Sequence, residues 1–311
     1  METILALLPK TIQLQLKGMS PDLFRKVEEV RIRIGRPIEL IAEGGRPIFI
    51  PYLVRPEDGE MFLNELSQFS LYTMEEELKR GYITVSGGHR VGLAGKVILE
   101  EGRVKAVRHI SSYNIRIARQ KVGIAEPLVP YLYEEGWLQS LIIGAPQTGK
   151  TTILRDLARV VSTGAAEWDI LPEKVGIVDE RSEIAGCIHG VPQLDFGPRV
   201  DVLDSCPKAE GMMMMIRSMS PDVLIVDEIG RQEDSAAVME AVNAGIKLMI
   251  TAHGGTYEEI CKRPVISELL SQSIFNRIIE LRRDREGKRH WAILDSAGRK
   301  IEEKAVEGRH A

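Results

Sequence analysis

A glycine-rich run from Gly144 to Thr151 constrains this chain more than any other feature. It fits the phosphate-binding loop pattern of Gly, four residues and then Gly-Lys-Thr. The glycines let backbone N–H groups surround phosphate oxygens with no Cβ in the way. Lys150 can reach the β- and γ-phosphates, and the Thr151 hydroxyl can ligate Mg²⁺. We therefore expect a nucleotide-binding run made of Gly144, Ala145, Pro146, Gln147, Thr148, Gly149, Lys150, Thr151 and Thr152.

The segments that flank this run favour the same interpretation. Leu141–Ile143 predicts a short buried strand before it. After it, apolar residues recur at helical spacing, at Ile153, Leu154, Leu157, Ala158 and Val161. A strand, a glycine-rich loop and a helix together aim a helix N-terminus at an anion. The alternative is a glycine-rich turn before an ordinary helix.

Composition limits the class of protein. The chain has 311 residues, enough for two domains, and its 44% hydrophobic and 28% charged residues are typical of a soluble globular protein. A net charge of −4 argues against a general binder of polyanions. The three widely spaced cysteines suggest reduced thiols in a cytosolic protein. We find no apolar run long enough to span a membrane, so we expect any membrane role to be peripheral and to act through partners.

The pattern along the chain predicts two domains. Residues 1–118 favour a smaller α+β domain, with helices around Leu14 and Leu23, a hairpin at 39–50, a helix within 61–79, and short strands separated by glycines up to Ile110. Residues 119–136 are predicted to be a connector in which Gly123, Pro127 and Pro130 break regular structure.

Residues 137–311 favour an α/β, RecA-like phosphate-loop domain. Apolar runs at 139–143, 175–178, 223–226 and 247–251 alternate with helix-capable segments, which predicts a mostly parallel sheet with helices on its faces. Two later runs, Phe275–Leu281 and Trp291–Leu294, predict a C-terminal hairpin.

Acidic residues follow the third of these strands. Asp227 and Glu228 come directly after the apolar run Val223–Val226, at the end of a strand where open α/β sheets bind ligands. Asp227 could hold Mg²⁺ directly or through water, and Glu228 could polarise the attacking water. The alternative is an acidic strand end exposed to solvent.

Two further strand ends carry polar groups. Glu180 and Glu183 follow the strand at 175–178, and either could be the base instead of Glu228, although a structural salt-bridge cluster is the alternative. His253 ends the run at 247–251 and could sense the γ-phosphate by hydrogen bonding, or be an ordinary surface histidine. No Asn-Lys-x-Asp element for reading guanine is found, so ATP is the expected nucleotide.

The phosphate loop, Val178–Glu183, Leu224–Glu228 and Thr251–Gly254, in this order, resemble the ATPase family of type II and type IV secretion systems. Four further runs resemble more closely the branch of that family that acts in sporulation of endospore-forming bacteria. They are Gly87–Gly95, Asn114–Arg119, Asp201–Asp204 and Ser220–Val223. One departure concerns the family's Gly-Glu-x-Arg motif, because here Asp227-Glu228-Ile229-Gly230-Arg231 displaces the arginine by one position.

The resemblance implies an Mg²⁺-dependent ATPase that forms a ring hexamer and holds ATP between its N-terminal and C-terminal domains. It also implies an arginine from the N-terminal domain on the γ-phosphate. Arg116 is the first candidate, and Arg90, Arg108 and Arg119 are the others. The implied partners are integral membrane subunits of the channel between mother cell and forespore, with this chain in the cytoplasm on the mother-cell side.

Two other functions remain open at this point. A nucleic-acid-associated ATPase is disfavoured by the acidic net charge and by an aromatic content of only 5%, which gives few stacking groups. A scaffold that binds nucleotide without hydrolysing it is disfavoured because the acidic motifs are intact.

Overall fold

The computed structural model describes residues 2–42, 45–67, 78–79, 81–284 and 288–305, and it divides into two units. The N-terminal unit comprises Met1–Arg119 together with Gly186–His189. The C-terminal unit comprises Gln120–Ala185 and Gly190–Ala311. Among the helices of these described ranges, none is both long and apolar enough to cross a bilayer.

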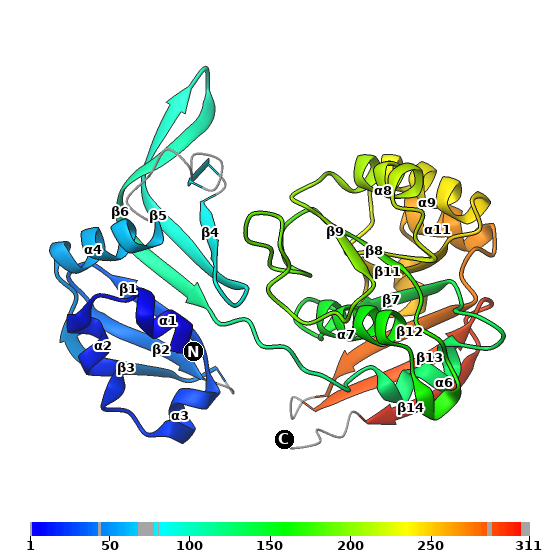
Figure 1. Ribbon diagram of the computed structural model, residues 1–311, viewed down its shortest axis with the longest axis horizontal. Helices are drawn as coiled ribbons and strands as arrows, with labels where there is room; N and C mark the ends of the chain where they lie inside the picture. Colours follow the sequence, from blue (N-terminus) through cyan, green and yellow to red (C-terminus); the bar gives the residue numbers. More distant parts are fainter. Residues whose placement is uncertain (1, 43–44, 68–77, 80, 285–287, 306–311) are drawn as a thin grey trace. The chain divides into compact units, whose positions relative to one another are not determined.

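The N-terminal unit contains one antiparallel sheet in the order β3-β2-β1-β6-β5-β4 (Figure 1). Its helices are α1 (Glu2–Leu7), α2 (Lys10–Lys17), α3 (Pro21–Lys26) and α4 (Pro56–Leu66). Its strands are β1 (Val27–Arg33), β2 (Pro37–Ala42), β3 (Pro47–Leu53), β4 (Tyr82–Val85), β5 (His89–Glu100) and β6 (Arg103–Arg116).

One face of this sheet is apolar and packs beneath the helices. Buried residues alternate along β2, as period-two patterning requires for a sheet with one covered face. Helix α2 buries Ile12 and Leu16, which are four residues apart and so lie on one side of the helix. Phe62 of α4 packs edge-on against Tyr113 of β6, with ring centroids 5.0 Å apart.

The C-terminal unit has an eight-stranded sheet in the order β14-β13-β12-β7-β11-β10-β8-β9. The six strands from β12 to β9 in this order pair in parallel, and β13 and β14 add to the β12 edge in antiparallel fashion. The strands are β7 (Ser140–Gly144), β8 (Val175–Asp179), β9 (Val200–Asp204), β10 (Val223–Val226), β11 (Lys247–His253), β12 (Arg277–Arg283), β13 (Arg289–Asp295) and β14 (Lys300–Ala305).

Helices cover both faces of this sheet (Figure 1). Helix α7 packs on one face against the central strands, while α8, α9 and α11 share a core with Leu141, Leu224 and Ile250 on the other. Every residue of β7, β8 and β10 is buried, as expected for central parallel strands. The helices are η2 (Glu126–Leu128), α6 (Val129–Leu132), α7 (Lys150–Thr163), η3 (Ala166–Trp168), α8 (Lys208–Ser218), α9 (Gln232–Asn243), α10 (Tyr257–Ile260) and α11 (Pro264–Ser271).

The predicted fold class is confirmed: a mostly parallel α/β sheet follows a smaller antiparallel α+β unit. The helix expected within 61–79 instead covers 56–66, and residues 68–77 and 80 lie outside the described ranges. The expectation that Pro127 and Pro130 break regular structure was wrong. Both lie in the first turn of a short helix, η2 and α6, where a missing N–H costs nothing.

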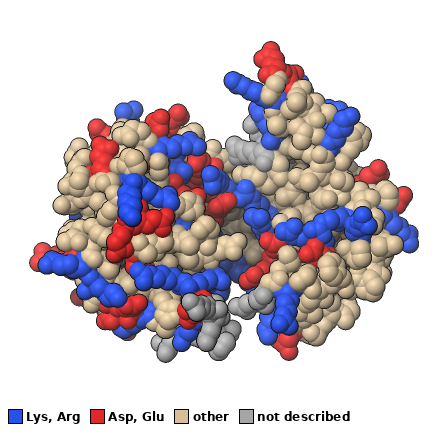
Figure 2. Space-filling model, turned by 180° about the vertical axis from the view of Figure 1, so that it is seen from behind, with Lys and Arg blue, Asp and Glu red and all other residues tan. Residues whose placement is uncertain are grey.

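Two of the short strands expected between glycines, at 91–94 and 96–99, form one continuous strand, β5, despite Gly92 and Gly95. Gly95 lies at a bulge, where a Cβ would come within 2.6 Å of the carbonyl oxygens of Arg108 and His109. Strands β9 and β14 were not predicted from the sequence. On the face that Figure 2 displays, basic and acidic side chains are interspersed over both units.

Candidate nucleotide-binding site

The carboxyl ends of four neighbouring parallel strands meet at one edge of the C-terminal sheet. Gly144 at the end of β7 is in register with His253 at the end of β11. Val226 of β10 is in register with Ile250 on one side and Val178 on the other. The phosphate loop, both acidic runs and the histidine therefore leave the sheet at the same edge, where open α/β sheets bind ligands.

The phosphate loop has the backbone that its sequence predicts. Gln147 and Gly149 have positive φ angles of 64° and 105°, and α7 begins at Lys150. At Gly144 a Cβ would come within 2.5 Å of the Thr148 Oγ1 and 2.8 Å of the Leu281 carbonyl oxygen, so only glycine fits there. The 14-residue helix α7 begins directly after this loop. The N–H groups of its first turn and its positive dipole end therefore face a loop that can hold an anion.

Lys150 is buried beside this loop and is only 5% exposed. Its ammonium donates hydrogen bonds to the carbonyl oxygens of Gly144, at 2.8 Å, and Ala145, at 3.2 Å. Burial lowers the pKa of Lys150, while the nearby carboxylates of Glu228 and Asp227 act in the opposite direction. The lysine and the two predicted acids therefore lie within electrostatic reach of one another.

Asp227 is held by two hydroxyl groups. Its Oδ2 accepts a hydrogen bond from the Thr151 Oγ1 at 2.8 Å, and its Oδ1 accepts one from Thr251. The contact with Thr151 joins the phosphate loop directly to the end of β10. A carboxylate beside a threonine hydroxyl offers the oxygen ligands that Mg²⁺ prefers, so the residues present fit that ion.

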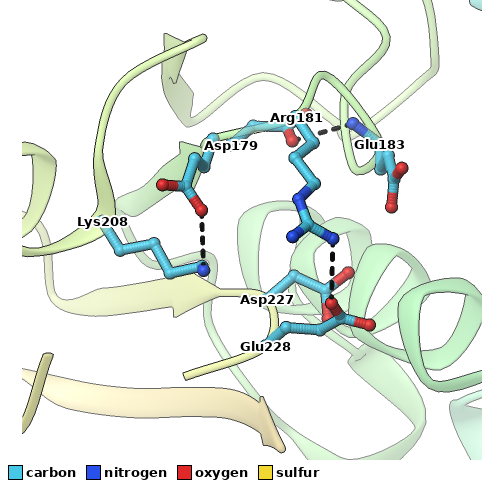
Figure 3. A pocket seen from close by; sticks show the side chains of 7 residues that line it. Asp179, Arg181, Glu183, Lys208, Asp227 and Glu228 are labelled. Atoms are coloured by element: carbon cyan, nitrogen blue, oxygen red, sulfur yellow. Dashed lines mark hydrogen bonds and ion pairs between the residues drawn. The ribbon is translucent and has the colours of Figure 1, made fainter. Parts of the chain in front are cut away.

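Glu228 has a left-handed backbone, with φ 55°, and a carboxylate with a partner on each oxygen. Its N–H donates to the Thr251 Oγ1 at 2.7 Å. Its Oε1 lies 2.9 Å from the His253 Nε2, and its Oε2 lies 3.3 Å from the Arg181 Nη1, the contact that Figure 3 marks. Residues from the ends of β8, β10 and β11 thus converge on this one carboxylate.

The segment that follows β8 is fixed by a buried carboxylate. Asp179 accepts hydrogen bonds from the N–H groups of Glu183, Ile184 and Ala185, at 2.8, 2.9 and 2.8 Å. Burial raises the pKa of Asp179 to about 6, against the effect of these donors. Arg155 of α7 supports the same segment, because it donates to the carbonyl oxygens of Ile184 and Glu183 at 2.8 Å each.

The two alternative glutamates have different surroundings. The Glu180 Oε2 accepts from the Lys208 Nζ at 2.8 Å, and its Oε1 lies 3.8 Å from the Arg231 Nη1. Burial alone would raise the pKa of Glu180, but its hydrogen bond to Lys208 and the nearby arginines bring that pKa below its usual value. Glu183 is exposed. Both line the pocket of Figure 3, with Asp179, Arg181, Lys208, Asp227 and Glu228.

Arg116 lies on β6 of the N-terminal unit. Its Nε is 3.6 Å from the Glu29 Oε1, and it is in register with Arg90 on β5. Arg90 stacks over the Tyr82 ring at 3.4 Å, and Arg119 donates to the Val27 carbonyl oxygen. Arg108, the remaining candidate, also lies on β6, in register with Lys96 of β5. The site residues predicted from the sequence other than these arginines lie in the C-terminal unit.

Several residues of this site were given no role from the sequence, among them Thr251, Lys208 and Arg155. Thr251 connects Asp227 to the Glu228 backbone, and its signal was a polar residue within the buried, apolar middle of a strand. Lys208 and Arg155 carry no local signal, because their contacts lie 28 or 29 residues away along the chain.

Two solved structures resemble the whole fold. The DotB ATPase of Legionella pneumophila has a TM-score of 0.61 at 16% identity, covering 93% of this chain and 81% of DotB. The pilus retraction motor PilT with bound ADP has a TM-score of 0.59 at 15% identity, covering 96% of this chain and 83% of PilT. At these identities the likeness shows the fold.

Sequence comparison identifies closer relatives. Stage III sporulation protein AA of Bacillus subtilis (strain 168) is 57% identical over 283 residues, which is 91% of each chain. A plant relative, Protein SEEDLING PLASTID DEVELOPMENT 1 of Arabidopsis thaliana, is 30% identical over 174 residues, 54% of this chain and 24% of that protein. The model of the family described as "Sporulation stage III, protein AA" matches residues 1–301. The chain belongs to that family.

Proposed function

We propose that this chain is an Mg²⁺-dependent ATPase that hydrolyses ATP to ADP and phosphate. The observation that carries the proposal is the 2.8 Å hydrogen bond from Thr151 to Asp227, because it joins the phosphate loop to a carboxylate at a strand end. A nucleotide hydrolase needs a phosphate cradle, a carboxylate near Mg²⁺ and a group that orients water, and the residues proposed for these three roles lie at this edge.

Each residue has a distinct role in this proposal. The N–H groups of the loop and of the first turn of α7 bind the phosphates, and Lys150 neutralises charge on the terminal ones. Thr151 and Asp227 would hold Mg²⁺, which would neutralise negative charge on the phosphate oxygens. Glu228 orients the attacking water and accepts its proton.

Glu228 is favoured over the two other glutamates as the base. Glu228 directly follows Asp227, which accepts a hydrogen bond from Thr151 of the phosphate loop. By contrast, Glu180 is paired with Lys208 at 2.8 Å, and Glu183 is exposed. His253, at 2.9 Å from Glu228, is suited to respond to the γ-phosphate through that carboxylate. Arg116 is proposed to complete the site from the N-terminal unit by stabilising charge on the γ-phosphate.

At the level of the assembly, we propose that the chain is the motor of a secretion-type membrane channel. Two observations about relatives support this: PilT is described as a pilus retraction motor, and the Bacillus subtilis relative is a sporulation protein. The proposed form is a homo-hexameric ring in the mother-cell cytoplasm, bound to integral membrane subunits of the channel to the forespore. ATP hydrolysis would change the angle between the units and pass movement to those subunits.

Release of phosphate from Mg-ATP tests the enzymatic proposal. Lys150→Ala is expected to abolish release, while Lys262→Ala, which changes an exposed lysine outside the residues assigned to the site, retains the parent rate. A Lys150→Ala protein that hydrolyses ATP as fast as the parent contradicts the site. Mass measurement in solution with a non-hydrolysable ATP analogue tests the ring, since a persistent monomer speaks against the motor.

A further inference from the structure

Arg181 faces the carboxylate of Glu228, the group that is proposed to orient the attacking water. Figure 3 shows its side chain extending toward Glu228, and the Nη1 to Oε2 distance is 3.3 Å. On the other oxygen, His253 approaches to 2.9 Å. Arg181 and His253 come from different strand ends, so together they restrict rotation of the Glu228 side chain from two sides.

The backbone that carries Arg181 has little freedom. Asp179, two residues earlier, is 2% exposed and accepts three N–H groups from residues 183–185. Arg155 binds two carbonyl oxygens of the same segment. Because this backbone is fixed, the Arg181 side chain starts from a defined position, and its contact with Glu228 costs less ordering than a contact from a mobile loop would.

The neighbouring acid of the same segment faces a different partner. Glu180 pairs with Lys208, whose side chain is only 11% exposed, so this carboxylate is kept from Glu228 by its own cation. Glu180 therefore faces Lys208 of α8, whereas Arg181 faces Glu228. Like charges would otherwise adjoin at the strand ends and disturb the carboxylate that must face water.

On the basis of the proposed ATPase function, we propose that Arg181 is a positioning residue. With His253, it fixes the Glu228 carboxylate in the orientation from which Glu228 acts on the attacking water. The contribution to stability is small, because the Arg181 side chain is 58% exposed and a solvated ion pair is weak. The contribution to turnover is larger, because a misplacement of about 1 Å in a catalytic group can cost about a hundredfold.

The test measures kcat, KM and the thermal midpoint of full-length Arg181→Ala and Arg181→Lys with Mg-ATP. Arg263→Ala is the matched control, because Arg263 pairs with Glu259 at 3.2 Å on the surface and its side chain is 46% exposed. We expect Arg181→Ala to lower kcat about ten- to hundredfold with little change in KM or midpoint. Arg181→Lys should recover much of kcat, and Arg263→Ala should match the parent.

A double variant shows through which residue Arg181 acts. In a Glu228→Gln background, Arg181→Ala should cause no further loss in single-turnover rate, because the group that it positions has already been removed. Losses that multiply would overturn the proposal. So would an unchanged kcat in Arg181→Ala, or a raised KM with kcat kept, which would indicate a direct contact with nucleotide.

Failure of the underlying function has a different signature. If the parent chain itself shows no hydrolysis that depends on Lys150, the ATPase proposal falls and the positioning role falls with it. If the parent hydrolyses ATP and Arg181→Ala does so equally well, only the positioning role is refuted.

Discussion

The N-terminal sheet is antiparallel and the C-terminal sheet is mostly parallel, and this difference decides where the polar side chains of each unit lie. In the C-terminal unit six strands run parallel, so residues far apart in sequence meet at one edge. In the N-terminal unit neighbouring strands run antiparallel, and charged groups spread across a face instead. Arg90, Arg116 and Glu29 lie side by side on β5, β6 and β1. In a parallel sheet, polar side chains can come together at the carboxyl ends of the strands, whereas in an antiparallel sheet they lie in rows across a face.

The largest expected effect lies at the end of β10. Glu228→Gln keeps the shape of the side chain but removes the carboxylate, so turnover should fall by about a hundredfold or more while Mg-ATP still binds. Phosphate release and binding of a fluorescent ATP analogue measure the two quantities. Unchanged turnover would move the base to Glu180 or Glu183, which follow β8 at the same edge of the sheet.

The N-terminal unit should respond to acid through His89. This histidine is 5% exposed, and its Nδ1 accepts a hydrogen bond from the Ala118 N–H at 3.0 Å, which only the neutral ring can do. Burial lowers the pKa of His89 from 6.5 to about 4. The unfolded chain therefore takes up a proton first, and stability is lost as the pH falls from about 6.5 to about 4, by up to about 3 kcal/mol.

Hydrogen exchange of the amides of β5 and β6 at several pH values measures this loss in the N-terminal unit alone. His89→Asn retains an acceptor but cannot titrate in this range, so its pH dependence should be flatter than that of the parent. A parent whose β5 and β6 amides are equally protected at pH 4.5 and 6.5 would argue against the role of His89.

Removing one buried hydroxyl group from each unit allows the two units to be compared under matched conditions. Thr251→Val removes the hydroxyl between Asp227 and the Glu228 N–H, and Tyr113→Phe removes the one that donates to the Gly59 carbonyl oxygen at 2.8 Å. Each change should lower the free energy of unfolding by about 1–2 kcal/mol, since a buried group loses its partner.

The two variants should differ in turnover. Thr251→Val disturbs both acids at the strand end and should lower kcat by about tenfold, whereas Tyr113→Phe should leave kcat unchanged. Urea titration and phosphate release on the same preparations provide the comparison. An equal loss of kcat in both variants would mean that general loosening, not the local contact, controls turnover.

The smallest change in stability is expected at Arg116. Its ion pair with Glu29 spans 3.6 Å and its side chain is 63% exposed, so Arg116→Ala should alter the free energy of unfolding by less than about 1 kcal/mol. If Arg116 acts on the γ-phosphate, kcat should nevertheless fall by about tenfold or more. Arg25→Ala, which removes an exposed pair with Asp22, is the control for a general change in charge.

The parts of the site that could be predicted from the sequence are those with local signals. The phosphate loop is a contiguous string, and central parallel strands are unbroken apolar runs, so Asp227, Glu180 and His253 could be assigned to strand ends. Strand β9 reads Val-Asp-Val-Leu-Asp and β14 is largely charged, because edge strands are only partly buried and lose the apolar signal.

What could not be predicted depends on partners that are distant in sequence. The sequence favoured Glu228 as the base but left Glu180 and Glu183 as alternatives. The contacts that separate them run from Glu180 to Lys208, and from Glu228 to Arg181 and His253. Which partner each glutamate contacts depends on the tertiary structure, because glutamates close together in sequence carry no local signal that distinguishes them.

The left-handed backbone of Glu228, with φ 55°, has a consequence for how this position can vary. Glycine, asparagine and aspartate tolerate that conformation more easily than glutamate does. A library randomised at this codon and sorted for thermostability should therefore enrich those three residues, whereas sorting for ATP consumption should return glutamate. Resistance to heat and catalytic output would pull this single site in opposite directions.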